Sequence, residues 1–145
     1  MKSPSKLGSL ILNSLSKAPA LNEQAQDQYE AEVRSRWGDT DAYRQSRART
    51  SRYTQEDFQA AKRDQEAATE MFVTAFGNRL SHTSAEAQAA VVAHREAISK
   101  WFYDCSIEMQ KNLALMYIED PRFKEYYDGR VRGLAQYVHD AITAQ

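Results

Sequence analysis

Cys105 is the only cysteine of the chain, and His82, His94 and His139 are its three candidate partners in catalysis. A thiol nucleophile needs a base within about 3 Å, and histidine supplies that base in many thiol enzymes. His94 lies eleven residues before Cys105, which is roughly 16 Å along one continuous helix. His82 and His139 lie in other segments and could approach only through the fold. The spacing argues against a thiol enzyme, and we expect Cys105 to be a small buried hydrophobic residue.

Metal and nucleotide sites leave recognisable patterns, and the sequence contains none of them. The three histidines share no metal-ligand spacing. A single cysteine excludes a multi-cysteine zinc site and an internal disulfide, which suits a reducing compartment. The glycines are isolated, and none lies in a phosphate-binding loop. We therefore predict no enzyme activity, no cofactor, no metal and a cytoplasmic location.

Aromatic residues and methionines are the remaining candidates for a functional site. Trp101, Phe102 and Tyr103 are consecutive, so on a continuous helix they spread over roughly 200°, and one core face cannot bury all three. Met109 and Met116 share a helix face, and flexible thioethers suit a surface that accepts several ligand shapes. Core packing is the competing interpretation for each of these residues. Together they predict a hydrophobic recognition cleft with a polar rim. Its lining residues are predicted to be Trp37, Tyr43, Trp101, Phe102, Tyr103, Met109, Met116 and Tyr117.

Helices must position these side chains. Apolar residues recur at spacings of three and four, and no segment alternates over the length of a strand, so we predict an all-α protein. Thr54 with Asp57 and Thr83 with Glu86 form capping boxes, and Asp120–Pro121 is typical of a helix start. A break near 104–106 separates two helices. We predict about six helices. The seven candidate segments are 27–36, a segment from 39 or 40 that contains Tyr43, 54–77, 83–104, 107–119, 121–128 and 131–142.

The size and charge of the chain indicate one soluble domain. The chain has 145 residues, 42% of them hydrophobic, and a net charge of −1, which does not favour direct binding to DNA. Six arginines between residues 34 and 52 could contact phosphate, but a solvated helix face is the favoured interpretation. The apolar run at 7–15 is too short for the roughly 20 residues of a membrane span. We predict a flexible leader at 1–26, a helical domain at 27–145, no membrane partner and a monomer.

Three strings of residues carry a resemblance to a known family. They are RWGDTDAYRQS at 36–46, HREAISKWFYDCSIEM at 94–109 and MYIEDPRFKEYYD at 116–128. Together, over residues 28–142, they resemble the TipAS antibiotic-recognition domain, the drug-binding half of thiostrepton-induced regulators of the MerR type. The resemblance implies a globin-like arrangement of the helices. It also implies large thiopeptide antibiotics as ligands, and a lid, here residues 28–52, that becomes ordered when the ligand binds.

The resemblance adds Cys105 and Asn112 to the candidate ligand-binding residues. One member of that family traps its ligand covalently, through a cysteine that adds to a dehydroalanine of the drug. That cysteine lies seven residues after a Tyr-Asp-Cys triplet, and the corresponding residue here is Asn112. An amide cannot act as a thiolate nucleophile. Unless Cys105 takes over this role from two helical turns earlier, the resemblance implies reversible binding.

Two classes of function follow from these observations. The first is recognition of amphipathic, multi-ring antibiotics without chemistry on them. Such a domain could be the effector-sensing part of a MerR-type transcription regulator or a standalone protein that sequesters the drug. The alternative is a protein–protein interaction module that uses exposed aromatic residues and the helices of residues 34–52.

Overall fold

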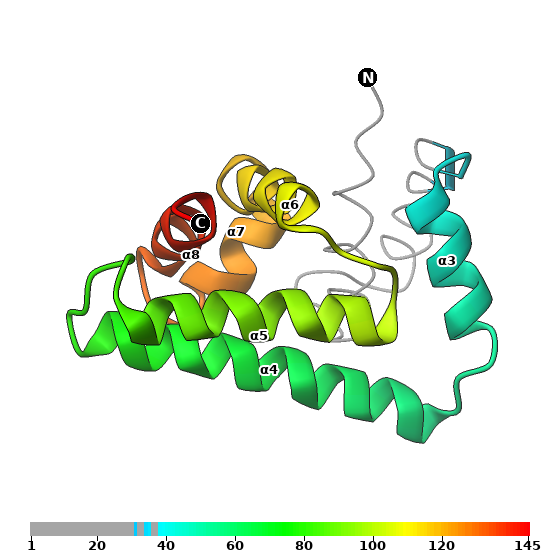
Figure 1. Cartoon of the computed structure of the whole chain (residues 1–145), viewed down its shortest axis with the longest axis horizontal. Coiled ribbons are helices and arrows are strands. Elements are labelled where there is room, and N and C mark those ends of the chain that lie inside the picture. Colours follow the sequence, from blue (N-terminus) through cyan, green and yellow to red (C-terminus); the bar gives the residue numbers. More distant parts are fainter. Residues whose placement is uncertain (1–30, 32–33, 36–37) are drawn as a thin grey trace.

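The computed structural model describes residues 31, 34–35 and 38–145, and six α-helices lie in that part of the chain (Figure 1). No strand occurs among the described residues, so the all-α prediction is confirmed. None of these helices is long and apolar enough to cross a membrane. Most of the predicted first helix, Trp37 and the predicted leader lie outside the described residues. The helices are α3 (Asp41–Thr50), α4 (Gln55–Gly77), α5 (Ala85–Trp101), α6 (Ile107–Glu119), α7 (Pro121–Asp128) and α8 (Leu134–Thr143).

Two long helices form the base of the fold. α4 and α5 run antiparallel and pack along their length, and α6, α7 and α8 lie on one side of this pair (Figure 1). Small side chains allow a close approach of helices, and both helices bury several alanines: Ala61, Ala68 and Ala75 on α4, and Ala87, Ala90 and Ala97 on α5. α3 lies at the opposite end from α8, beside the connection between α5 and α6. The described residues that were predicted to line a cleft lie on α3, at the end of α5 and on α6.

Side-chain caps fix most of the helix starts where the sequence predicts them. Thr54 caps α4 in a capping box, accepting from the Asp57 amide at 3.2 Å while the Asp57 carboxylate accepts from the Thr54 amide at 2.9 Å. Asp120 caps α7, whose first residue is Pro121. The capping box predicted at Thr83 is wrong, because Ser84 caps α5 by accepting from the Ala87 amide at 3.1 Å.

Two helix boundaries differ from the prediction for local backbone reasons. α5 ends at Trp101 rather than near residue 104, because the amides of Phe102 and Tyr103 both donate to the carbonyl of Ile98, at 2.9 and 3.3 Å. The last helix begins at Leu134 and not at 131. Gly133 precedes it with a φ of 90°, a left-handed conformation that cannot continue a helix.

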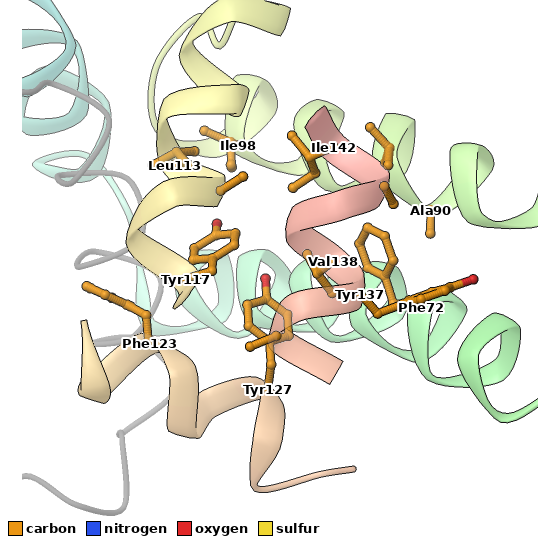
Figure 2. Close-up of a cluster of buried hydrophobic side chains, with 14 of the residues drawn as sticks. Phe72, Ala90, Ile98, Leu113, Tyr117, Phe123, Tyr127, Tyr137, Val138 and Ile142 are labelled. Carbon is orange, nitrogen blue, oxygen red and sulfur yellow. The ribbon is translucent and has the colours of Figure 1, made fainter. Parts of the chain in front are cut away.

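The core lies where α6, α7 and α8 meet the α4–α5 pair. Phe72 of α4, Ile98 of α5, Leu113 of α6 and Val138 of α8 are fully buried there (Figure 2). Tyr127 reaches the same core from α7. Every helix from α4 to α8 contributes, so α6 and α7 are held against a single packed interior. α3 contributes only Ala42 to this core cluster.

Candidate functional site

The three consecutive aromatic residues lie at the point where α5 ends. Because the helix stops at Trp101, Phe102 and Tyr103 are not spread around a continuous helix, and the turn directs both into the core at 0% and 1% exposure. Trp101 is half-buried. Its indole nitrogen donates to the Asp64 carboxylate at 2.7 Å, and its ring packs edge-on against Tyr53 at 5.6 Å. Trp101 is therefore the member of the trio that reaches the surface.

Polar contacts attach α3 to this same turn. Arg49 donates to the Ser99 carbonyl at 2.6 Å and to the Asp104 carboxylate at 2.8 Å. Gln45 accepts from the Asp104 amide at 2.9 Å. Just after α3, the Tyr53 hydroxyl donates to the Trp101 carbonyl at 2.6 Å. We call Arg49, Gln45, Ser99 and Asp104 the Arg49 clasp. It holds α3 beside residues 101–103, which we call the aromatic turn.

Removing the clasp is expected to loosen α3 without unfolding the protein. The side chain of Asp104 is 82% exposed, so its ion pair is worth little, whereas the bond from Arg49 to the Ser99 carbonyl is partly buried. Arg49→Ala should lower the opening free energy of α3 by about 1–2 kcal/mol. Hydrogen exchange should show faster exchange in α3 and unchanged exchange in α4 and α8.

The matched control is Asp104→Asn, which removes the charge and keeps the backbone amide that Gln45 accepts from. Its effect on exchange in α3 should be below about 1 kcal/mol. Equal effects of the two variants would show that the exposed ion pair, and not the bond to Ser99, holds α3.

The outer flank of α6 carries the two methionines. Met109 and Met116 are half-buried against the core, and Asn112 is exposed between them. These three positions are one and two turns apart, so they form a stripe along α6. The stripe leads to an open hollow of about 470 Å³ at the junction of α6 and α7. The hollow is lined by Met116, Glu119, Asp120, Pro121 and Arg122.

Two of the charged side chains around this hollow, Asp120 and Arg122, neutralise each other. Asp120 accepts from the Arg122 guanidinium at 2.9 Å and 3.1 Å, and it also caps α7 through the Arg122 amide at 3.0 Å. Glu119 remains exposed at the rim. The hollow therefore presents the apolar surfaces of Met116 and Pro121 beside a paired carboxylate and guanidinium. The sequence indicates Asp120 and Pro121 as a helix start, but it gives no sign that they border a site.

The other predicted site residues are part of the interior. Phe102, Tyr103, Cys105 and Tyr117 all belong to the buried core cluster. Tyr43 is half-buried on α3, with the Arg47 guanidinium 5.8 Å from its ring centre. The structure thus separates the predicted residues into a buried group and an accessible group. The accessible ones are Tyr43, Trp101, Met109, Asn112 and Met116.

Cys105 is poorly suited to nucleophilic chemistry in this environment. Burial raises the pKa of its thiol to about 12, and the thiol donates to the Ser106 carbonyl. His94 is fully buried, and both of its ring nitrogens are bonded to other side chains, Tyr117 and Gln110. Burial lowers the pKa of His94 to about 4. Within the described residues, no cluster of three or more histidine, cysteine, aspartate or glutamate side chains could hold a metal ion.

Known proteins resemble this chain in both sequence and structure. The profile of the TipAS antibiotic-recognition domain matches residues 29–145. The HTH-type transcriptional activators TipA of Streptomyces coelicolor and of Streptomyces lividans are each 44% identical to it over 118 residues, covering 81% of this chain and 47% of theirs. The HTH-type transcriptional activator mta of Bacillus subtilis is 32% identical over 122 residues, covering 83% of this chain and 46% of its own. The chain therefore spans about half the length of the curated relatives it matches.

A solved structure has the same arrangement of helices. It is TipAS in complex with nosiheptide, described as part of a thiopeptide antibiotic multidrug resistance system from Streptomyces lividans. The two structures agree with a TM-score of 0.75 at 44% sequence identity, covering 81% of this chain and 82% of the other. The family profile, at residues 29–145, spans all six helices described above. This chain belongs to the TipAS antibiotic-recognition domain family.

Proposed function

We propose that this chain binds thiopeptide-like antibiotics, reversibly and without chemistry on them. The observation that carries the proposal is its likeness to a structure solved with nosiheptide, at 44% identity and a TM-score of 0.75. The surface between α3, the aromatic turn and the α6 stripe supports it. Binding there needs no nucleophile, and the one thiol of the chain is buried.

The chemistry of the accessible residues suits an amphipathic ligand with several rings. Trp101 and Tyr43 offer flat aromatic surfaces, and Met109 and Met116 offer flexible apolar ones that adapt to ligand shape. The amide of Asn112 can both donate and accept at the rim. Because Asp120 and Arg122 neutralise each other, the hollow does not require a charged ligand.

Two uses of such binding are compatible with the proposal. The match covers slightly less than half of each curated relative, and these relatives are transcriptional activators, so the chain could be the effector-sensing part of a MerR-type regulator. A domain of this kind can also act alone and lower the concentration of free drug. Both uses need the same binding step, and that step is what the first experiment measures.

A protein–protein interaction module is less well supported. The alternative relied on free arginines and exposed aromatic residues near α3. Arg49 is committed to the clasp, Arg44 pairs with Asp41, and Arg47 lies against Tyr43. These side chains satisfy one another and leave less charge for a partner chain.

Titration with nosiheptide tests the proposed function. Calorimetry and proton–nitrogen NMR should show saturable binding by the wild-type chain, with shifted peaks in α3, the 102–106 turn and α6. Met116→Asn removes apolar contact surface from the α6 stripe and should weaken binding roughly 10- to 100-fold. Leu115→Asn is the matched control, because Leu115 is 47% exposed on the neighbouring face of the same helix. Absence of saturable binding by the wild type, or equal losses in the two variants, would contradict the proposal.

A further inference from the structure

One imidazole in the core bonds to two positions of the same helix. His94 of α5 has its Nε2 atom 2.8 Å from the Tyr117 hydroxyl and its Nδ1 atom 2.8 Å from the Gln110 amide nitrogen. Gln110 and Tyr117 both lie on α6, seven residues and therefore two turns apart. The three side chains are between 0% and 4% exposed. Both nitrogen atoms of one buried ring are thus bonded to side chains of α6.

The bonding pattern fixes the orientation of every group in this network. The Gln110 amide nitrogen also donates to the Val91 carbonyl at 2.8 Å, while its oxygen accepts from Arg95 at 3.1 Å and from Gln145 at 3.0 Å. An amide nitrogen can only donate, so Nδ1 of His94 accepts. The proton of the neutral ring therefore lies on Nε2 and is donated to Tyr117. This arrangement of protons satisfies all of these contacts.

Both apolar packing and hydrogen bonding affect the rotation of α6. The inward face consists of Gln110, Leu113, Ala114 and Tyr117. A rotation of about 100°, equivalent to a slip by one residue, would turn Met109, Asn112, Leu113 and Met116 inward instead. Methionine fills irregular core space well, so the two methionines could take the places of Gln110 and Tyr117. Apolar packing opposes the rotation at the other two positions, where Asn112 would replace Leu113 and Leu113 would replace Ala114.

Hydrogen bonding opposes that rotation strongly. Turning α6 by one position removes both partners of His94 and leaves a buried imidazole, a buried amide and the Val91 carbonyl without their present bonds. Unsatisfied buried polar groups are costly, and buried polar pairs are known to fix helix register in other proteins. The network therefore opposes the rotation at positions 110 and 117, where apolar contacts alone would tolerate a methionine.

We propose that His94, Gln110 and Tyr117 form a positioning network that keeps Met109 and Met116 half-exposed on the outer flank of α6, at the ligand site proposed above, instead of fully buried in the core. Each methionine directly precedes a network residue in the sequence, so fixing Gln110 and Tyr117 fixes the direction of both thioethers. The consequence for ligand binding rests on the function proposed above. The consequence for the methionines themselves does not depend on any ligand.

The test removes the polar network and follows the methionine methyl groups. The variant carries His94→Leu together with Gln110→Leu, which replaces both partners by apolar side chains. Methyl NMR with methionine labelling, in the presence of a soluble paramagnetic agent, reports the solvent access of Met109 and Met116. In the wild type we expect one signal for each, broadened by the agent. In the double variant we expect duplicated or protected signals and at least a tenfold loss of nosiheptide affinity.

Two further variants complete the design. Leu113→Ile changes the same buried face without touching a hydrogen bond, and it should keep single, accessible methionine signals. If the double variant does not fold, Gln110→Met removes only the Nδ1 half of the network and should still protect or duplicate the Met109 signal. Wild-type methionine signals in every folded variant would overturn the proposal. Altered signals in the variants, combined with no nosiheptide binding by the wild type, would overturn the proposed function and leave the positioning role standing.

Discussion

Asn112→Cys is expected to convert reversible binding into covalent capture of a thiopeptide that carries a dehydroalanine. Asn112 is exposed on α6 between Met109 and Met116, so a thiol there would face a ligand lying along the stripe. An exposed cysteine has a pKa near its ordinary value of about 8.5, which leaves a reactive fraction of thiolate at neutral pH. The native Cys105 lacks that fraction, because burial raises its pKa to about 12.

The expected reaction is an addition in which nothing leaves. The thiolate sulfur bonds to the terminal carbon of the dehydroalanine double bond, and the electron pair moves to the neighbouring carbon, which takes a proton from water. Intact mass spectrometry after incubation with thiostrepton or nosiheptide should therefore show the sum of the two masses for the variant. The wild type should show no adduct.

Leu115→Cys is the matched control for this experiment. It places a thiol of similar exposure on the same helix but away from the methionine stripe. Its adduct should form at least tenfold more slowly than that of Asn112→Cys. An adduct on Cys105 in the wild type, or equal rates for the two introduced cysteines, would mean that the ligand does not lie along the stripe.

Mild acid is expected to destabilise the protein through His94. Its pKa is lowered from 6.5 to about 4, first by burial and second by the nearby Arg95. The unfolded chain therefore binds a proton at pH values where the folded protein does not. The contribution of His94 is fully present above about pH 6.5 and is lost as the pH falls towards 4. The loss is roughly 3 kcal/mol over that whole range and about 2 kcal/mol between about pH 7 and pH 5.

His94→Gln isolates this effect. Glutamine does not titrate, and its amide can bond to the same two partners. Denaturant unfolding at a series of pH values gives the pH dependence of the unfolding free energy for both proteins. The contributions of His82 and His139 cancel in the difference, because both proteins contain these residues. The variant should lose about 2 kcal/mol less than the wild type between about pH 7 and pH 5. Parallel curves for the two proteins would show that His94 is already charged, or already accessible to protons, in the folded state.

Helix positions followed from the sequence because their causes are local. The Thr54 capping box and the Asp120–Pro121 start each depend on residues within one turn, so short-range chemistry was sufficient. The errors also had local causes. Ser84 and Thr83 are both good caps, and nothing within the segment distinguishes them. At Gly133, the left-handed conformation delays a helix that hydrophobic periodicity alone extends to Val131.

Local sequence patterns predicted only part of the candidate site. The sequence marked the aromatic turn and the two methionines as a group, and the structure places Trp101, Met109 and Met116 at the surface. It could not separate them from Phe102 and Tyr103, because burial depends on where α5 stops. The Arg49 clasp joins residues about fifty positions apart, and no local pattern indicates that pairing.

The sequence by itself determined that the protein is helical, where most of the helices lie, and the resemblance to a family. The helices depend on residues that are close in the sequence, and the resemblance depends on three short strings of residues. Tertiary structure alone decided which aromatic residues are core, that His94 bridges two turns of α6, and that this bridge turns the methionines outward. The reason is that burial and buried hydrogen bonds are set by contacts between distant segments, so one residue type can be core or binding surface according to how the helices pack.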